Sequence, residues 1–179
     1  MAKLLGISGS LRTESVNSKL VREAARLYAA DSFDMADLNI PLFNGDDEDK
    51  DGLPDSVQTL VAQIEAADGV ILSTPEYNAA ITGVLKNALD WVSRAKPGPW
   101  AGKPVAVMSA AAGRAGGVRA QTMLRSCMTP FKVRLVAESE VAIAGARSEF
   151  DDDGRLKSER YEASVLRLMN ALKAEIERS

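Results

Sequence analysis

Short apolar runs alternate along the chain with longer segments in which apolar positions recur at helical spacing. The run at residues 69–73 is continuous and β-branched, which is typical of a strand that is buried on both faces. Residues 161–178 instead place Val165, Leu168 and Leu172 on one face, as an amphipathic helix does. The expected strands span residues 3–8, a short stretch through Phe33, Met35 and Leu38, and residues 69–73, 104–109 and 139–144. The expected helices span residues 15–30, 57–67, 81–94, 118–128 and 161–178.

This alternation predicts an α/β fold, a doubly wound parallel sheet with helices on both faces. No repeat or linker divides the chain, so residues 1–179 are expected to form a single domain, with a loop at residues 39–55. Ligands of such sheets bind at the carboxyl ends of the strands. Three loops of unusual composition follow such ends, at residues 8–17, 74–78 and 109–117.

The composition excludes several kinds of active site and partner. The chain has 179 residues, a net charge of −3, one cysteine and no histidine. The lack of histidine excludes a Ser-His-Asp triad and a His-ligated metal, and Cys127 with carboxylates would make a poor zinc site, so no metal is expected. The small charge gives no attraction to nucleic acid or to an anionic membrane. No apolar stretch is long enough for a signal peptide or a membrane span, so a cytoplasmic protein is expected.

The first loop has the residues of a phosphate site. It joins the first strand to the first helix, and a helix start offers unpaired backbone N–H groups and the positive end of the helix dipole. Ser10, Ser15 and Asn17 add neutral donors, Arg12 adds a fork-shaped cation, and Gly9 lets a ligand approach the backbone. The alternative is purely structural: Ser15 would cap the helix and Arg12 would be solvated.

The other two loops suit a planar ring. After the third strand, Pro75 fixes a turn, Tyr77 can pack against a flat ring, and Glu76 and Asn78 can orient the loop. The loop at residues 109–117 is mostly Ala and Gly, which lets a large ring approach the backbone. The alternatives are a plain turn with Asn78 as the cap of the next helix, and a flexible glycine loop.

Several blocks of the chain resemble the NADPH-dependent FMN reductases, a group that includes bacterial quinone, chromate and azo reductases. The blocks are Gly9-Ser10-Leu11-Arg12 with Ser15 and Asn17, then Pro75-Glu76-Tyr77-Asn78, then Gly83-Val84-Leu85-Lys86-Asn87-Ala88-Leu89-Asp90-Trp91, and finally Gly113, Gly116 and Gly117 with Arg119-Ala120-Gln121. The resemblance covers nearly the whole chain in the same order. In one departure, Ala80 and Thr82 stand where many relatives carry a serine and then a proline.

The resemblance implies a flavodoxin-like three-layer sandwich with a five-stranded sheet in the order 2-1-3-4-5. It also implies an enzyme that uses NADPH or NADH to reduce non-covalently bound FMN, and then a quinone, a free flavin, an azo compound or a metal oxyanion such as chromate. Its site residues follow by position. Ser10, Arg12, Ser15 and Asn17 would hold the FMN phosphate; Pro75, Glu76, Tyr77 and Asn78 would line the isoalloxazine; Ser109 and Gly113 would touch its pyrimidine side. Apart from possible stacking by Tyr77, no catalytic side chain is expected, because the flavin carries the chemistry.

The helix expected at residues 81–94 indicates a protein partner. Residues such as Leu89, Trp91 and Val92 give it more apolar surface than one stripe against a sheet requires, and Trp100 follows in a Pro/Gly loop. The resemblance also implies homodimers, sometimes paired into homotetramers, with the flavins near the interface. We therefore expect at least a homodimer, with Trp100 against the second subunit.

Two other classes of protein remain open. A flavodoxin-like electron carrier without NAD(P)H reductase activity would share the fold, but a strongly acidic surface and a phosphate loop without arginine would be expected of it. A receiver-type interaction domain would need acidic residues at the end of the first strand, where this chain has Ser8-Gly9-Ser10. Reduction of the bound flavin by NADPH alone would separate the enzyme from the carrier.

Overall fold

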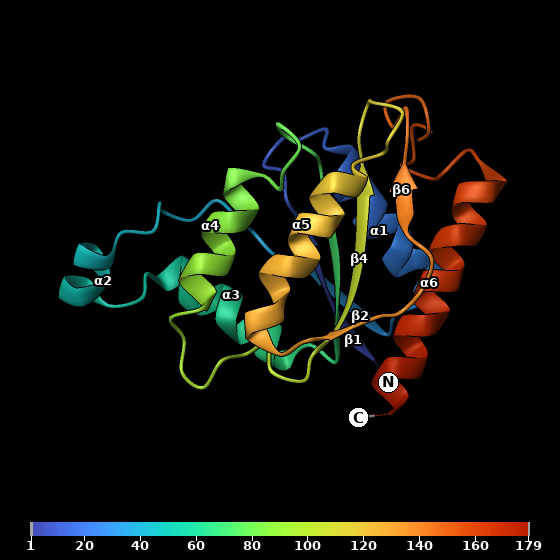
Figure 1. Cartoon of the computed structure of the whole chain (residues 1–179). Helices are drawn as coiled ribbons and strands as arrows, with labels where there is room; N and C mark the ends of the chain where they lie inside the picture. The colour runs from blue at the N-terminus through green and yellow to red at the C-terminus, as the bar shows by residue number, and fades with distance from the viewer. Residues whose placement is uncertain (1, 179) are drawn as a thin grey trace.

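A parallel sheet forms the centre of the computed structural model, which describes residues 2–178 (Figure 1). Its strands are β1 (Lys3–Ser8), β2 (Ser32–Met35), β3 (Gly69–Thr74), β4 (Pro104–Ala110), β5 (Arg134–Leu135) and β6 (Val141–Ile143). They lie in the order β2-β1-β3-β4-β5, and β6 also pairs with β4. The predicted parallel sheet of order 2-1-3-4-5 is confirmed.

Two short strands share the fifth position of the sheet. β5 pairs with the start of β4, at Pro104 and Val105, and β6 pairs with the end of β4, from Met108 to Ala110. The strand expected at residues 139–144 is β6, whereas β5 was not predicted. β5 has only two residues, both half-buried, so its sequence carries no strand pattern.

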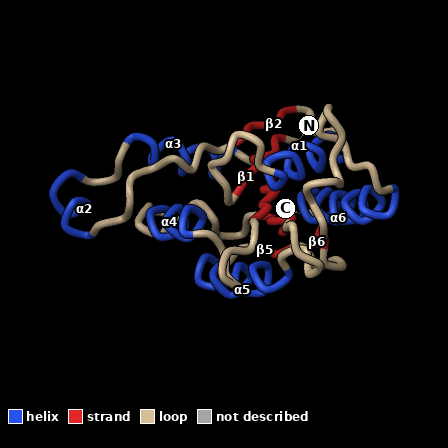
Figure 2. Tube along the Cα trace, turned by 90° about the horizontal axis from the view of Figure 1, so that it is seen from above, coloured by secondary structure: helices blue, strands red, loops and turns tan. Residues whose placement is uncertain are grey.

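The α-helices are α1 (Val16–Tyr28), α2 (Gly45–Asp51), α3 (Asp55–Ala66), α4 (Gly83–Val92), α5 (Val118–Met128) and α6 (Glu159–Glu177). All of them except α2 lie in the two outer layers of the molecule. α1 and α6 cover one face of the sheet, and α3, α4 and α5 cover the other (Figure 2). Ser15, Thr82 and Ser158 begin α1, α4 and α6, each accepting a hydrogen bond from the backbone N–H three residues further on. Between residues 2 and 178, none of these helices is long and apolar enough to cross a membrane.

Side chains of the central strands alternate between two cores. Ile71 packs on the side of α1 and α6, whereas Val70 and Leu72 pack on the side of α3, α4 and α5. All residues of β3 and β4 are buried, because helices cover both faces of the sheet there. These two strands therefore give the loops at their carboxyl ends a rigid base.

Residues 39–54, here called the arm, project from the body of the molecule and carry α2 at their far end (Figures 1 and 2). The sequence predicted only a loop for this segment. The Trp91 indole of α4 donates to the arm backbone at 2.8 Å, and the ring of Phe43 packs edge-on against Trp91 with 4.9 Å between centroids. The Arg94 guanidinium lies 2.8 Å from the Glu48 carboxylate of α2. The arm is thus fixed to α4, although no residue of α2 is buried.

Trp100 is buried within its own chain, so the expectation that it faces a second subunit is wrong. Its side chain is 2% exposed, and its ring lies 6.3 Å from that of Phe131. The loop before β4 is held there by the Gly102 N–H, which donates to the Lys132 carbonyl at 3.0 Å. Leu89 and Val92 of α4 are also buried by their own chain. The apolar surplus of this helix therefore does not by itself require a partner.

Candidate functional site

The carboxyl ends of β1, β3 and β4 border a cavity of about 570 Å³. This volume lies within the range of roughly 300–1,000 Å³ that is usual for small-molecule sites. Eight of the ten residues expected to bind a cofactor line the cavity: Ser10, Arg12, Ser15, Asn17, Pro75, Glu76, Tyr77 and Gly113. Asn78 and Ser109 are not among its lining residues.

The first turn of α1 forms one end of the cavity. Ser15 caps this helix and accepts a hydrogen bond from the Ser18 N–H at 3.3 Å. The backbone N–H groups of Val16 and Asn17 have no hydrogen-bond partner within residues 2–178, as expected of donors at a helix start. Arg12 is exposed, and its guanidinium makes no ion pair in the same part of the chain. Unpaired N–H groups, a helix dipole and a cation together suit an anionic group.

The Asn17 side chain, expected to hold a phosphate, is hydrogen-bonded to other elements of the fold. It is 1% exposed. Its Nδ2 donates to the Ala110 carbonyl at 2.9 Å, and its Oδ1 accepts from the Ser73 hydroxyl at 2.8 Å and from the Ala110 N–H at 3.0 Å. The side chain therefore joins the start of α1 to β3 and β4, and only the backbone N–H of Asn17 remains available to a ligand.

The loop after β3 forms a tight turn with Tyr77 at the cavity. Tyr77 and Ala80 exchange two backbone hydrogen bonds of 3.1 and 3.0 Å. Between them, Asn78 and Ala79 adopt positive φ angles of 53° and 61°. Asn78 is therefore a turn residue that tolerates the left-handed region, and the helix cap is Thr82. The Tyr77 side chain is 50% exposed, which leaves its ring available to a planar ligand.

Thr82 ties α4 to the first loop. Its hydroxyl donates to the Gly9 carbonyl at 2.7 Å and accepts from the Leu85 N–H at 3.2 Å. The loop after β1 also lies very close to the end of β3, because a Cβ on Gly9 would lie 2.9 Å from the hydroxyl of Thr74. Thr82, one of the two residues in the departure from the family pattern, thus has a structural role at the site.

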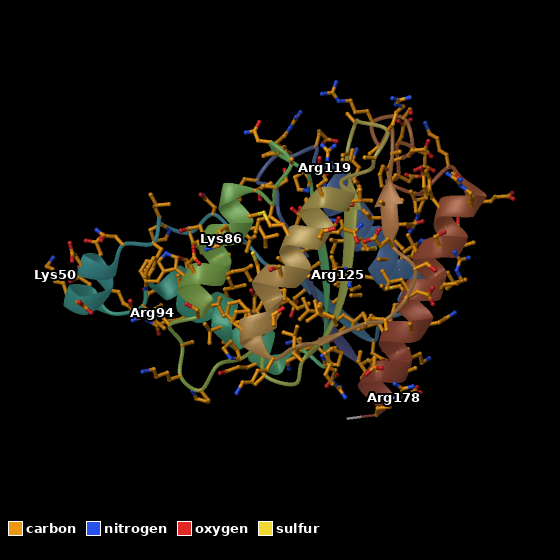
Figure 3. All side chains as sticks on the ribbon, in the orientation of Figure 1. Lys50, Lys86, Arg94, Arg119, Arg125 and Arg178 are labelled. Carbon is orange, nitrogen blue, oxygen red and sulfur yellow. The ribbon has the colours of Figure 1, made fainter. Side chains whose placement is uncertain are left out.

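Glu76 connects the second loop to α5. Its carboxylate accepts from the Arg119 N–H at 3.1 Å, and the Arg119 guanidinium lies 3.7 Å away. Arg119 lies in the first turn of α5, whose own cap residue, Gly117, has no side chain to bond a free N–H (Figure 3). Glu76 therefore supplies the cap from another loop and fixes the second and third loops relative to each other.

The third loop is shaped by close backbone contacts. Gly116 and Gly117 have positive φ angles of 60° and 93°, and a Cβ on Gly116 would lie 2.7 Å from the backbone of Ala142. The Ser109 hydroxyl donates to the Gly116 carbonyl at 2.6 Å and accepts from the Gln121 side chain at 2.8 Å. Ser109 is fully buried and is not among the residues that line the cavity, so it shapes this loop from behind, and its contact with the flavin stays a prediction.

Three charged residues of the cavity were not predicted, namely Glu14, Lys19 and Arg147. The Lys19 ammonium lies 2.9 Å from the Glu14 carboxylate, and this hydrogen bond and charge hold the pKa of Glu14 below its usual value. Arg147 lies in the turn after β6. A signal for it existed, because it follows the carboxyl end of an expected strand, as the other three loops do.

These features fit FMN. The start of α1 and Arg12 offer donors and positive charge to a phosphate, and the small residues of the third loop leave its backbone open to a ring. Tyr77 and Pro75 border the same space. Among residues 2–178, no group of three His, Cys, Asp or Glu side chains is placed to hold a metal ion.

Comparison with known proteins identifies relatives that are FMN reductases and quinone reductases. The model of the NADPH-dependent FMN reductase family matches residues 2–148. An NAD(P)H-dependent FMN reductase of Pseudomonas aeruginosa is 42% identical over 178 residues, which cover 98% of this chain and 96% of that protein. A quinone reductase of Escherichia coli is 39% identical over 130 residues, which cover 70% of this chain and 69% of that protein.

A solved structure agrees with these sequence matches. The flavoenzyme NAD(P)H:(acceptor) oxidoreductase of Paracoccus denitrificans superimposes with a TM-score of 0.89 at 30% identity, covering 99% of this chain and 98% of that one. The family match spans all three loops of the cavity. The chain therefore belongs to the NADPH-dependent FMN reductase family.

Proposed function

We propose that this chain is an NAD(P)H-dependent oxidoreductase that holds FMN in the cavity and reduces a small-molecule acceptor. The observation that carries the proposal is the convergence of three loops on one cavity, where an unpaired Arg12 lies near the free N–H groups that begin α1. The acceptors in question are quinones, free flavins, azo compounds and metal oxyanions such as chromate. The names of the relatives support the same class of reaction.

The residues of the chain bind FMN and orient it toward the nucleotide and the acceptor. FMN, when bound, would supply the redox chemistry, which is hydride transfer from NAD(P)H and electron transfer to the acceptor. The N–H groups of Val16 and Asn17, with Arg12, hold the phosphate. The third loop and Pro75 border the ring. Tyr77, half exposed at the cavity edge, is placed to stack on a planar group, so it helps to bring the nicotinamide and the flavin together.

The binding test uses apo-protein titrated with FMN and with riboflavin, which lacks the phosphate. We expect FMN to bind one per chain without a covalent bond. Arg12→Ala should weaken FMN binding by about 1.5–3 kcal/mol, the usual loss for a charged hydrogen bond, and should leave riboflavin binding nearly unchanged. A wild-type protein with no affinity for FMN would refute the proposal. Equal losses for both ligands would show that Arg12 acts on the fold instead.

The electron-carrier alternative is tested with the reconstituted protein under anaerobic conditions. NADPH or NADH alone should remove the visible absorption of the bound flavin, and steady-state assays against a quinone, free FMN and an azo dye should then rank the acceptors. A flavin that stays oxidised with both nucleotides, yet is reduced by a separate reductase, would identify a carrier.

The proposal includes assembly into at least a homodimer, with a homotetramer built from two such dimers as the larger form. An exposed apolar residue of the arm supports this part of the proposal. Leu42 is 81% exposed, on a segment that α4 holds in place. A stable interface would bury at least about 1,200 Å². Leu42→Glu should shift the mass measured by light scattering toward the monomer, whereas Leu166→Glu on α6 is the matched control. A wild-type monomer at micromolar concentration would contradict this part. The cytoplasmic location expected from the sequence stays a prediction.

A further inference from the structure

Arg147 lines the cofactor cavity, although it lies outside the three loops that the sequence pointed to. It sits in the turn after β6, exposed to solvent, and it makes no hydrogen bond or ion pair with the described part of the chain. Its nearest acidic neighbour in sequence, Glu149, does not pair with it, and Asp151 accepts from backbone N–H groups of its own turn instead. The guanidinium is therefore available to a ligand of the cavity.

The positive charge that Arg12 brings to the cavity is smaller than the negative charge of a phosphate monoester. Lys19 is neutralised by Glu14 at 2.9 Å, so it adds little net positive charge. A phosphate monoester carries between about 1.5 and 2 negative charges at neutral pH and has three acceptor oxygens. Arg12 alone would leave part of this charge uncompensated. Arg12 follows β1 and Arg147 follows β6, with β3 and β4 between these strands, so the two cations reach the cavity from its two sides.

The turn that carries Arg147 is fastened to the site by its backbone. Ala146 is fully buried, and its N–H donates to the Ala111 carbonyl at 3.1 Å. The Ala111 N–H in turn donates to the Ile143 carbonyl at 3.0 Å. Because Ala110 is bonded to Asn17, this ladder places the turn beside the start of α1, at the end of the cavity assigned to the phosphate.

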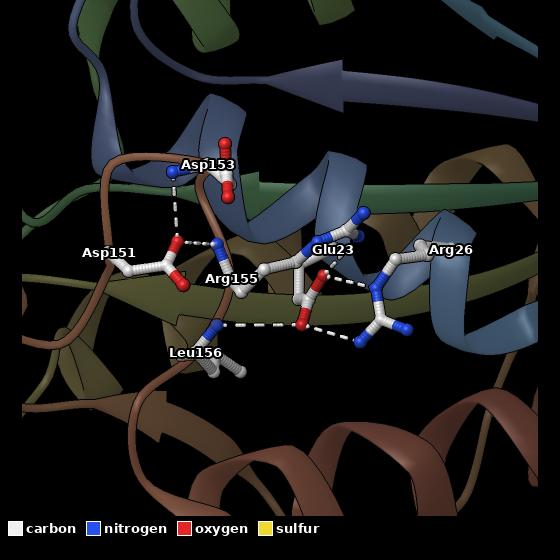
Figure 4. Close-up of polar contacts among 6 residues, drawn as sticks. All are labelled: Glu23, Arg26, Asp151, Asp153, Arg155 and Leu156. Carbon is white, nitrogen blue, oxygen red and sulfur yellow. Dashed lines mark hydrogen bonds and ion pairs between the residues drawn. The ribbon is translucent and has the colours of Figure 1, made fainter.

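A buried carboxylate of α1 holds the segment that follows Arg147 (Figure 4). The Glu23 side chain is fully buried and accepts from the Arg26 guanidinium at 2.7 and 2.8 Å, from Arg155 at 3.2 Å and from the Leu156 N–H at 3.4 Å. Burial raises the pKa of Glu23, but the hydrogen bonds and charge of Arg26, with the contributions of Leu156 and Arg155, outweigh it and hold the pKa below its usual value. Glu23 is thus a carboxylate that fixes the return of this segment onto α1.

We propose that Arg147 is a second cation for the FMN phosphate and that Glu23 is the positioning residue that holds it there, through Arg155 and Leu156. The inference rests on the proposed function, because it takes FMN as the ligand. The same phosphate monoester chemistry occurs in the 2′-phosphate of NADPH, so the test must separate the two sources.

The test measures the Kd of FMN and of riboflavin for Arg147→Ala, Arg147→Lys and Arg114→Ala. Arg114 is the matched control, an exposed arginine of the neighbouring loop that does not line the cavity. Arg147→Ala should weaken FMN about tenfold, as loss of one charge-assisted contact does, and should leave riboflavin unchanged. Arg147→Lys should recover part of the loss, and Arg114→Ala should have little effect.

A double mutant tests the positioning role. Glu23→Gln should weaken FMN more than riboflavin, and combining it with Arg147→Ala should weaken FMN no further than Arg147→Ala alone, because both changes remove the same contact. Additive losses would overturn the role of Glu23. Unchanged FMN affinity in Arg147→Ala would overturn the proposal for Arg147. If that variant instead raises the KM of NADPH but not that of NADH, the ligand of Arg147 is the 2′-phosphate of the nucleotide. A wild-type protein that binds no FMN would instead refute the proposed function itself.

Discussion

Replacing Asn17 by alanine separates two roles that the sequence cannot tell apart. The structure assigns its side chain to three buried hydrogen bonds, two with the backbone of Ala110 and one with the hydroxyl of Ser73. Asn17→Ala would remove all three, including both side-chain contacts to the buried backbone of Ala110. Each unsatisfied buried group costs about 1–3 kcal/mol, but the Ser73 hydroxyl can rotate and the cavity can admit water. We expect a loss of about 2–4 kcal/mol in the free energy of unfolding.

The measurement is urea unfolding of the apo-protein, followed by titration with FMN and riboflavin. For a protein of this size the expected loss lowers Tm by roughly 4–16 °C. Because the variant loosens the junction of α1 with the sheet, both ligands should bind more weakly. Asn170→Ala, at an exposed position of α6, is the control and should change the unfolding free energy by less than about 0.5 kcal/mol. Unchanged stability in Asn17→Ala with a loss of affinity for FMN alone would refute the reasoning, and would return Asn17 to the role of phosphate ligand.

Three further predictions concern stability. The pKa of Glu23 is lower in the folded protein than its ordinary value of 4.5. The ionised carboxylate therefore stabilises the fold fully above pH 4.5, and this stabilisation is lost as the pH falls through the lower folded pKa. The difference in unfolding free energy between wild type and Glu23→Gln should shrink in that acid range. Gly116→Ala should lower the free energy of unfolding by about 2–4 kcal/mol, because alanine is strained at a positive φ angle and its Cβ would lie 2.7 Å from the backbone of Ala142. Gly113→Ala, with open space around its Cβ, is the control and should be nearly neutral in thermal unfolding. Trp91→Phe should raise the rate of amide hydrogen exchange in the arm by removing its indole bond, and unchanged exchange would contradict the docking role of that residue.

The position of the site could be predicted from the sequence because of a rule of geometry. Parallel strands bring their carboxyl ends to one edge of the sheet, so unusual loops after three strands must lie together. Tyr77 and Arg12 were therefore found at the cavity without any knowledge of the fold in detail. Arg147 obeys the same rule but was not predicted, because its turn follows the fifth expected strand and is not one of the three loops singled out in the sequence.

The role of individual polar side chains was harder to predict. A buried polar group at a strand end needs a hydrogen-bond partner, but the partner can be a ligand or the neighbouring backbone. Asn17 and Ser109 both satisfy this need within the protein, through contacts with residues far away in sequence. Trp100 shows the same limit for packing, since a loop residue that fills a core leaves no periodic signal.

The position of α6 has a consequence for how the chain can be shortened. The similarity to the family model ends at residue 148, but Val165, Leu168 and Leu172 of α6 are buried against Leu20 and the other apolar residues on that side of the sheet. A chain ended at the limit of the family model would expose this apolar surface to water and would lose two of the partners of Glu23, Arg155 and Leu156. The limit of the family model and the limit of the apolar core therefore fall at different residues in this protein, and the Pseudomonas aeruginosa relative, which aligns over 98% of the chain, extends beyond the family model as the core does.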